Sequence, residues 1–465
     1  MLRNVPLIVI LGSTGTGKTK LSIELARRFG AEIISADSMQ VYRGLDIVTA
    51  KATKHEQSMA KHHLLDVVDA GSNFTVVDFR DTALPIINNL LEAKKIPIIV
   101  GGTNYYIESA LWKVLANPLN DNRKRKIESV DSDDGKEVDA NKEDSGQWYA
   151  TDQFEGRTPA ELHKLLQSVD PDSAQRLHPN DHRKVKRALE VYENCGKTMT
   201  AIINEQKNIP GGNDYGGPLR YEHIILFWLQ CDQEILNKRL DSRIDDMLSQ
   251  GLVKEIRSFY NLAKQNYNKA KVDATKGAIQ SIGLKEFIPY LEKYDEQEDE
   301  RLIDFLTSEK ATDQSPPESL LLLKSCLETL RLVTKRYSRN QPKWIRNRFL
   351  RSVNRQVPPM YTLSTNNPDN WNEDVYLKAE NVIQSYMDNT TADLKPCEQL
   401  ENPRKDLDPN VTNICETCNK PFVGEFQWKL HLRSNKHKHQ LARLKKQKYL
   451  EESTVSGSVT ENSLK

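Results

Sequence analysis

An eight-residue segment near the start of the chain has the spacing of a phosphate-binding loop. It follows the apolar run 5–11 and reads G-x-x-x-x-G-K-T. Glycines let successive backbone N–H groups turn toward phosphate oxygens, the lysine adds a point charge, and the threonine hydroxyl can ligate Mg²⁺. A helix predicted for residues 18–29 adds its N-terminal dipole. A tight turn without a ligand is the alternative, against which the Lys-Thr pair argues. The candidate diphosphate-binding residues are Gly12, Ser13, Thr14, Gly15, Thr16, Gly17, Lys18 and Thr19.

Such a loop fits ATP-binding and other nucleotide-binding proteins, so the choice of chemistry depends on its companions. A hydrolase needs a carboxylate at the end of a sheet strand to hold Mg²⁺ and order water. The strand predicted at 96–100 ends in Gly-Gly-Thr, which leaves Asp66 and Asp69 as weaker candidates. Residues 35–42, S-A-D-S-M-Q-V-Y, end the second predicted strand, at the sheet edge where ligands bind. Asp37 can therefore face the phosphate loop.

A second group of chemical residues lies near the end of the chain, with the spacing C-x₂-C-x₁₂-H-x₅-H. Cys415, Cys418, His431 and His437 would supply two thiolates and two imidazoles to a tetrahedral Zn²⁺ ion. His439 is an alternative to His437, with a less usual spacing. The flanking lysines and arginines suit contact with an RNA backbone or a nuclear import signal. A purely structural zinc site with a solvated surface is the alternative.

Length, charge and cysteine content restrict the class of protein. The chain has 465 residues, a net charge of +1 and six cysteines, of which only Cys415 and Cys418 are closely spaced. A nucleic-acid partner would therefore be bound by local basic patches. No apolar run approaches the roughly 20 residues that span a bilayer. We expect a protein without a membrane anchor, in a reducing compartment and with one metal site.

The elements that position these residues follow from the pattern of apolar runs. Strands predicted at 5–11, 32–36, 95–100 and 222–229 alternate with helices at 18–29, 76–93 and 233–250, which is typical of a parallel sheet covered on both faces. A polar segment at 121–158 contains the acidic stretch 128–144 and predicts a mobile loop. Helices at 159–167 and 182–194 predict an inserted helical subdomain, and a long helix is predicted at 320–350.

The predicted fold class is α/β: a P-loop NTPase-like parallel sheet core with an inserted helical subdomain and a C-terminal C2H2-type zinc finger. The predicted domains are the first part of the core, 1–116; the inserted tRNA-binding subdomain with its acidic loop, 117–215; the continued core and C-terminal helices, 216–388; a linker, 389–412; the finger, 413–448; and a disordered tail, 449–465.

Six ordered motifs give the chain a specific resemblance. Besides the phosphate loop and the D-S-M-Q-V-Y run, they are residues 101–106 (G-G-T-N-Y-Y), 178–181 (H-P-N-D), 239–243 (R-L-D-S-R) and 280–283 (Q-S-I-G). Over most of its length the chain resembles the tRNA dimethylallyltransferases, also called tRNA isopentenyltransferases. The C-terminal finger resembles the eukaryotic branch of that family.

The resemblance implies that the loop holds dimethylallyl diphosphate, and that the prenyl group moves to N6 of the adenosine next to the anticodon. Asp37 would be the general base, because N6 of adenine is a poor nucleophile. Lys18, the loop amides and Mg²⁺ at Thr19 would stabilise the departing diphosphate, with Arg243 as a further cation. Arg239, four residues earlier on the same helical face, could contact a phosphate, and it could equally be a solvated charge or part of a surface ion pair. Thr16 and Thr103 are hydroxyl candidates near the diphosphate, and either could instead satisfy local backbone groups.

The resemblance also implies contacts with tRNA, made by a basic stripe on a helix, residues 183–187, and by the segment around Asp37. Gln40 has the donor and acceptor that an adenine edge requires. A second basic cluster at 335–344 could contact the same backbone, although Asn340 stands where the family usually has a basic residue. The implied tRNA-binding residues are Asp37, Ser38, Met39, Gln40, Arg183, Lys184, Val185, Lys186, Arg187, Gln280 and Ser281.

Two rival functions remain at this point. A nucleotide or small-molecule kinase would use the same loop for ATP, but it leaves the finger and the basic helix unexplained. A nucleic-acid-binding module with a degenerate loop would bind without reacting, and the intact Lys18, Thr19 and Asp37 argue against it. We expect a monomer in the cytoplasm, with mitochondrial and nuclear pools possible.

Overall fold

The computed structural model describes residues 5–69, 72–113, 154, 156–213, 215–266, 277–307, 316–352, 355–402, 406–408 and 411–460. The acidic stretch 128–144, and the predicted loop around it as far as residue 153, lie outside the described residues. Two compact units divide the chain. The core unit comprises Met1–Ala116 and Pro210–Leu400, and the accessory unit comprises Asn117–Ile209 and Glu401–Lys465.

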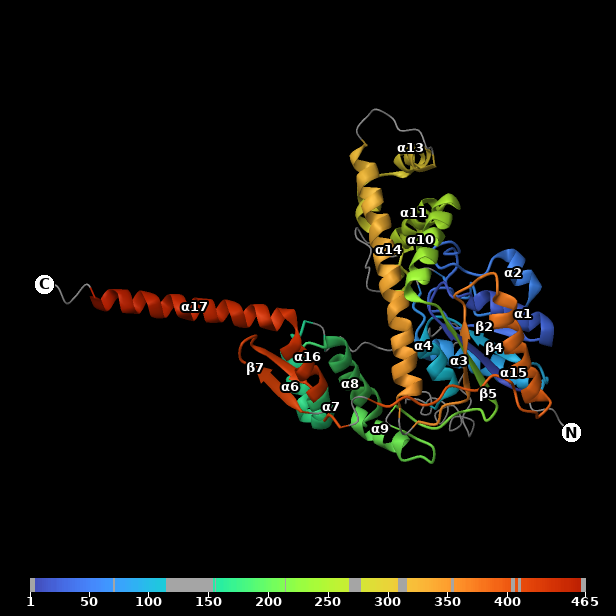
Figure 1. Cartoon of the computed structure of the whole chain (residues 1–465), viewed down its shortest axis with the longest axis horizontal. Coiled ribbons are helices and arrows are strands. Elements are labelled where there is room, and N and C mark those ends of the chain that lie inside the picture. Colours follow the sequence, from blue (N-terminus) through green and yellow to red (C-terminus); the bar gives the residue numbers. More distant parts are fainter. Residues whose placement is uncertain are drawn as a thin grey trace, which may run out of the picture. The chain divides into compact units, whose positions relative to one another are not determined.

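A parallel sheet forms the centre of the core unit (Figure 1). Within the described residues it has six strands in the order β3-β2-β4-β1-β5-β6. The strands are β1 Leu7–Gly12, β2 Glu32–Ser35, β3 His62–His63, β4 Pro97–Val100, β5 Ile224–Gln230 and β6 Met360–Ser364. In-register pairs such as Ile10 with Val100 align the carboxyl ends of neighbouring strands at one edge. The predicted α/β class with a parallel sheet is therefore confirmed.

Both faces of the sheet are buried, because alternate side chains of each strand point to opposite faces. Val9 and Leu11 pack with α3 and α4, whereas Ile8 and Ile10 pack with α1 and α15. The helices and helical turns of the core unit are α1 Lys18–Phe29, α2 Lys54–Met59, α3 Val76–Glu92, α4 Asn104–Leu111, α10 Gln233–Ser249, α11 Leu252–Asn266, η2 Gly277–Gln280, α12 Ile288–Lys293, α13 Glu296–Thr307, α14 Glu318–Ile345, η3 Arg346–Leu350, η4 Asn372–Tyr376 and α15 Leu377–Met387.

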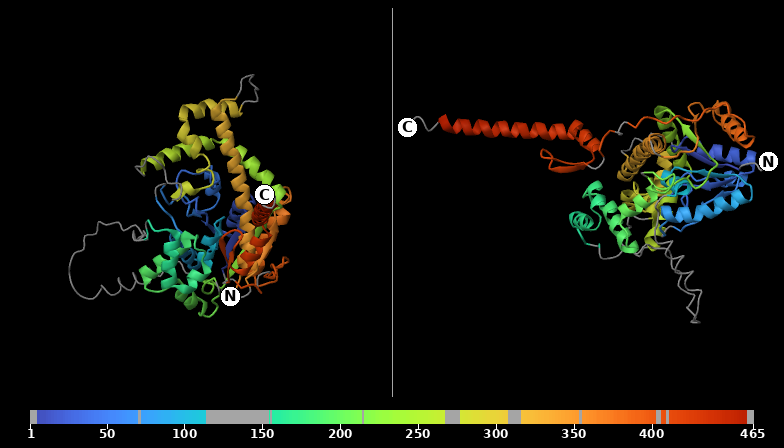
Figure 2. Two further views of the ribbon diagram at one scale, coloured as in Figure 1. Left: turned by 90° about the vertical axis from the view of Figure 1, so that its left-hand side faces the viewer. Right: turned by 90° about the horizontal axis from the view of Figure 1, so that it is seen from below.

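The longest helix of the core unit, α14, connects the sheet to a helical extension. It packs with α10, α12 and α13 and also contacts α4 beside the sheet (Figure 1). Two further views show the same helix from other directions (Figure 2). We expected one helix over 320–350, but α14 ends at Ile345 and continues as the π-helical turn η3. Pro342 inside the helix lacks the N–H of a regular i→i−4 bond, which accounts for a local departure from α geometry.

Many elements of the core unit were not predicted, among them α2, α4, α11, α12, α13, β3, β6 and α15. Strand β3 has only two residues, and β6 is a partly exposed edge strand in which only Met360 and Leu363 are buried. The helix α15 follows η4, another π-helical turn, so its start has no clear capping signal. Short edge strands and uncapped helices give weak sequence patterns, because tertiary pairing stabilises them more than local propensity does.

The accessory unit contains a small helical body and the Cys/His module. Its helices and strands are α6 Pro159–Val169, α7 Pro171–Arg176, α8 His182–Cys195, α9 Met199–Lys207, β7 Thr412–Cys415, β8 Lys420–Val423, α16 Glu425–Arg433 and α17 Asn435–Thr460. Leu162, Leu166 and Leu189 form a separate apolar core among α6, α7 and α8. Among the described helices, none is long and apolar enough to cross a membrane.

Candidate active site and metal centre

The phosphate loop connects β1 to α1 and depends on glycine at several positions. Gly15 and Gly17 have φ of 84° and 86°, a backbone region that residues with a side chain rarely adopt. A Cβ on Gly17 would also lie 2.7 Å from the ring of Trp371, and one on Gly12 would lie 2.8 Å from the carbonyl oxygen of Leu229. The backbone conformation and the close contacts therefore favour glycine at these positions of the loop.

Hydroxyl groups within the loop stabilise the loop itself. Ser13 Oγ donates to the carbonyl of Ser338 on α14, and Thr16 Oγ1 donates to the carbonyl of Ser13, both at 2.8 Å. Ser13 and Thr16 are buried. Of the two alternatives for Thr16, the structure shows the bond to a local backbone group. We therefore assign the side chains of these two residues to loop geometry, to which the backbone N–H of Thr16 adds a bond to the carbonyl of Ser13 at 3.4 Å.

Two cations face the loop from different elements. Lys18 Nζ donates to the carbonyl of Ser13 at 2.8 Å, and Arg243 Nη1 on α10 donates to Thr14 Oγ1 at 3.1 Å. Burial lowers the pKa of Lys18 to about 8; the negative charge of Asp37 opposes this effect, and the positive charge of Arg243 adds to it. Burial also lowers the pKa of Arg243. A partly buried pair of neighbouring cations is unfavourable, so the arrangement is suited to a bound anion.

Asp37 lies in the turn after β2, beside the turn after β4. Its Oδ1 accepts the backbone N–H of Met39 at 2.9 Å. The next residue is fixed by Thr103, whose Oγ1 accepts the N–H of Ser38 at 3.0 Å. A Cβ on Gly101 would lie 2.1 Å from the carbonyl oxygen of Ala36, so the two turns touch through bare backbone. Thr103 holds the turn that carries Asp37, which is the local role left open for it above.

Residues of α14 join the phosphate loop to these turns; they lie in the cluster 335–344, for which the sequence had predicted only a contact with tRNA. Gln341 Oε1 accepts the N–H of Thr14 at 2.9 Å, and Gln341 Nε2 donates to the carbonyl of Gly102 at 3.1 Å. The hydroxyl of Tyr337 donates to the same carbonyl at 3.1 Å. Burial raises the pKa of Tyr337, and the charge of Asp37 adds to the effect. The signal available in the sequence was the pair Tyr337 and Gln341, two polar residues four positions apart in a segment rich in charged residues.

Two cavities of different polarity meet at Asp37. The larger, about 510 Å³, is lined by the phosphate loop, Lys18, Thr19 and the turns at the sheet edge. The smaller, about 250 Å³, is mainly apolar and is lined by Met39, Val48, Leu240, Ile244, Met247, Ile282 and Leu330. Both are lined by Thr14, Asp37, Arg243 and Tyr337. The site can therefore hold a charged group and an apolar group next to one carboxylate.

The residues predicted to bind the target base differ in whether their polar groups already have hydrogen-bond partners within the protein. The carboxamide of Gln40 accepts from Ser35 Oγ at 3.1 Å and donates to the carbonyls of Thr49 and Ala50, so it holds a loop instead of offering its donors to a base. Gln280 and Ser281 line the apolar cavity with Ser38 and Met39. Ser281 Oγ is buried and, among the described residues, has no hydrogen-bond partner.

Other charged candidates have defined partners. Asp66 Oδ1 accepts from Lys51 Nζ and Asp69 pairs with Arg43, which argues against either as the Mg²⁺ carboxylate of a hydrolase. Arg239 donates to the carbonyl of Asn366 at 3.0 Å. This contact with a backbone carbonyl is neither a phosphate contact nor a solvated charge or surface ion pair, the roles considered for Arg239 above.

The basic stripe lies on α8 of the accessory unit. Arg183 and Lys184 are exposed, whereas Lys186 and Arg187 lie 4.0 Å from Glu190. Val185 is fully buried in the core among α6, α7 and α8. The prediction that Val185 contacts tRNA is therefore wrong for its side chain, since residue 185 falls on the apolar face of the amphipathic helix.

The four predicted zinc ligands converge in the accessory unit. Their ligand atoms all lie within 4.8 Å of one another, and Sγ of Cys415 and of Cys418 each lie 3.5 Å from His437 Nδ1. Ligand bonds of about 2.3 Å to sulfur and about 2.0 Å to nitrogen give about this separation in a tetrahedron. His431 Nε2 is buried and has no hydrogen-bond partner in the described part of the chain. The donor set fits Zn²⁺, and it includes His437, not His439.

Comparisons with known proteins agree with both parts of the site. Residues 40–348 match the model of the IPP transferase family, and residues 413–438 match a zinc-finger double-stranded RNA-binding family. A tRNA dimethylallyltransferase of Mus musculus is 40% identical, covering 98% of this chain and 89% of its own; one of Homo sapiens is 39% identical over the same shares. A solved eukaryotic dimethylallyltransferase acting on tRNA has a TM-score of 0.70 and 26% identity, covering 97% of this chain and 100% of its own.

The lowered pKa of Lys18 predicts a pH dependence of anion binding. Because the ammonium form binds the anion, affinity for inorganic diphosphate falls as pH rises above about 8, by up to about tenfold per pH unit. Calorimetric titration between pH 7 and pH 9.5 measures this fall. Diphosphate itself titrates in this range, so Lys18→Met supplies the baseline and Lys20→Ala the matched control. An identical pH slope in the Lys18→Met variant would contradict this role.

The convergence of the four ligands predicts one tightly bound zinc ion per chain. Cys418→Ala should remove it, because the remaining ligands cannot complete a tetrahedron, whereas His439→Ala should retain it. Elemental analysis after gel filtration gives the zinc content of each variant. Loss of zinc from His439→Ala with retention in His437→Ala would reverse the assignment.

Proposed function

The chain belongs to the IPP transferase family, and from that membership we propose that it is a tRNA dimethylallyltransferase. The proposed reaction transfers the dimethylallyl group of dimethylallyl diphosphate to N6 of the adenosine adjacent to the anticodon in tRNA. The products are N6-isopentenyladenosine and diphosphate. The relatives at 39% and 40% identity, which bear this enzyme name, support the proposal.

One observation carries the proposal: a carboxylate stands where a phosphate-binding cavity meets an apolar one. An allylic diphosphate has a charged end and a five-carbon apolar end joined at one carbon. With the diphosphate on the loop near Lys18 and Arg243, the reacting carbon would lie close to Asp37. In a nucleoside triphosphate the group next to the phosphates is the polar ribose, whereas an allylic diphosphate has its apolar chain there, which favours the prenyl donor over ATP.

The residues suit the steps of the transfer. The N6 lone pair attacks C1 of the allylic group, the C1–O bond breaks, and its electron pair leaves with the diphosphate. The proton on N6 passes to Asp37, a step worth about 10²–10⁴ in rate for a well-placed base. Lys18, Arg243 and the loop amides stabilise the charge that develops on the leaving group. Tyr337, which donates to Gly102, keeps the turn beside Asp37 in place.

Magnesium belongs to the proposal as a partner of the diphosphate. The Thr19 hydroxyl lines the larger cavity at the start of α1, where oxygen ligands of this kind hold Mg²⁺ together with phosphate oxygens. When bound, the ion would supply further positive charge to the leaving group. Thr19 would hold the ion, while Lys18 and Arg243 would orient the diphosphate.

The tRNA contacts are proposed from three regions. Ser38, Met39, Gln280 and Ser281 line the apolar cavity, and the unpartnered Ser281 hydroxyl could bond an edge of the target base. Arg183 and Lys184 are exposed and would contact phosphates. The finger resembles a double-stranded RNA-binding family, and we propose that it binds the tRNA stem.

Replacement of the proposed base tests the mechanism. Asp37→Asn should lower transfer of radiolabelled dimethylallyl groups to an anticodon stem-loop by about 10²-fold or more, since the amide cannot take the N6 proton. Affinity for the stem-loop should stay within a few-fold of the parent, as measured by filter binding. Asp69→Asn, which alters a surface pair with Arg43, is the control that should retain activity.

The same assay separates the proposal from its rivals. Label at adenine N6 with ATP present as a competing donor supports the prenyltransferase. ATP turnover without labelled RNA would return the site to the kinase or ATPase class. Near-parental transfer by the Asp37→Asn variant would remove Asp37 from the role of base.

A further inference from the structure

Residues 45–51 form a loop that contributes to the walls of both cavities. Ile47 lines the larger cavity, Val48 lines the apolar cavity, and Thr49 lines both. The loop connects the turn after β2 with α2. It therefore lies between the two ligand-binding spaces, and its position affects the shape of each.

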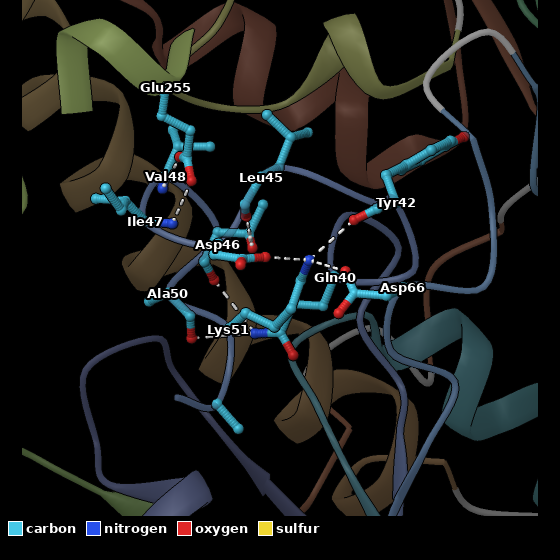
Figure 3. A network of polar contacts seen from close by, with 12 residues as sticks. Gln40, Tyr42, Leu45, Asp46, Ile47, Val48, Ala50, Lys51, Asp66 and Glu255 are labelled. Atoms are coloured by element: carbon cyan, nitrogen blue, oxygen red, sulfur yellow. Dashed lines mark hydrogen bonds and ion pairs between the residues drawn. The ribbon is translucent and has the colours of Figure 1, made fainter. Parts of the chain in front are cut away.

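A carboxylate from a distant helix fixes the middle of this loop. Glu255 on α11 accepts the N–H of Ile47 with Oε1 and the N–H of Val48 with Oε2, each at 2.8 Å (Figure 3). The Gln40 carboxamide holds the next two residues through their carbonyls. Charge-assisted bonds to two successive amides are stronger than neutral ones and define the backbone direction at Val48.

A buried lysine fixes the end of the loop. The side chain of Lys51 is only 1% exposed, and its Nζ donates to Asp46 Oδ1 at 2.7 Å, to the carbonyl of Tyr42 at 2.9 Å and to Asp66 (Figure 3). A buried ammonium group is costly without such partners. A shift of this end of the loop would separate Lys51 from Asp66 and from the Tyr42 carbonyl, which lie outside the loop, so these contacts oppose its movement.

The fixed backbone places the Val48 side chain against Gly283. A Cβ on Gly283 would lie 2.2 Å from Val48 Cγ2 and 3.7 Å from Leu330 Cδ1. Val48, Gly283 and Leu330 therefore meet, and Val48 and Leu330 both line the apolar cavity. Gly283 has φ of 102°, so its lack of a side chain also suits its backbone. This contact closes part of the apolar wall.

A wall at this place would govern the length of the allylic chain. Allylic diphosphates of five and ten carbons carry the same diphosphate and the same reacting carbon, so Lys18, Arg243 and Asp37 cannot distinguish them. Only the surface that surrounds the apolar tail can do so, by steric exclusion. We propose that Val48, positioned by Glu255, limits the donor to a five-carbon chain; this inference rests on the proposed function.

The test compares two donors in one assay. The ratio of kcat/KM for geranyl diphosphate to that for dimethylallyl diphosphate is measured with the full chain and an anticodon stem-loop. With either donor, C1 bonds to N6, the C1–O bond breaks and the N6 proton is lost. Val48→Ala removes two methyl groups from the wall and should raise the ratio by about tenfold or more. Leu330→Ala should raise it similarly, and Leu332→Ala, 64% exposed on the same helix, should not.

Variants of Glu255 test the positioning role. Glu255→Ala leaves two loop amides without their acceptor, so Val48 can move and the ratio should rise while Val48 itself is unchanged. Glu255→Gln retains one acceptor oxygen and should give an intermediate ratio. Lys254→Ala, exposed on the same helix, is the matched control. A general loss of stability would lower both rates and leave their ratio unchanged, so the ratio separates positioning from folding.

The assay distinguishes failure of the proposed function from failure of the inference about Val48. Absence of transfer from either donor by the parent chain would overturn the proposed function. Dimethylallyl transfer by the parent, with an unchanged donor ratio in folded Val48→Ala and Leu330→Ala variants, would overturn the present inference alone. A raised ratio in the Val48 variant with no change in Glu255→Ala would retain Val48 as the wall and reject Glu255 as its positioning residue.

Discussion

The side chain of Gln341 makes the two hydrogen bonds on which the arrangement of the site depends. One end accepts from the phosphate loop at Thr14, and the other donates to Gly102 in the turn after β4. A parallel sheet brings these turns to a common edge but does not fix the distance between them. Because Gln341 is buried, loss of either bond would leave an unsatisfied polar group, which costs about 1–3 kcal/mol. The position of the phosphate loop relative to the turn beside Asp37 is thereby fixed by the protein itself.

Partial burial strengthens the attraction of Lys18 and Arg243 for an anion. Lys18 and Arg243 lose water without gaining a full counter-charge, and the lowered pKa of each reflects that cost. A bound anion would relieve the cost, so the arrangement of the two cations favours an anionic ligand. The neighbouring cavity is mainly apolar, so an apolar group bound in it would exclude water and strengthen the electrostatic contacts of Asp37. The two cavities together therefore suit a ligand that has one charged end and one apolar end.

Predictions from sequence succeeded where the determinants lie close together in the chain. The helix after the phosphate loop begins at Lys18 and ends at Phe29, as expected from a glycine at each end. The four zinc ligands meet as their spacing indicated, because two short strands and the two helices α16 and α17, all close together in the chain, suffice to bring them together. The reading of residues 183–187 as one contact surface failed at Val185, since helical periodicity turns that side chain into the core.

The sequence by itself determined the chemistry that the chain can perform: a phosphate loop, a carboxylate at the end of β2 and a zinc-binding module, each defined by local spacing. Only the tertiary structure decided which residues hold that chemistry in place. Gln341 meets Thr14 across 327 residues, and Glu255 meets Ile47 across 208. No periodicity in the chain relates such pairs, because folding, and not sequence distance, brings their helices to the sheet edge. The same reason explains why Gln40, apparently suited to reading a base, proved to be a backbone anchor.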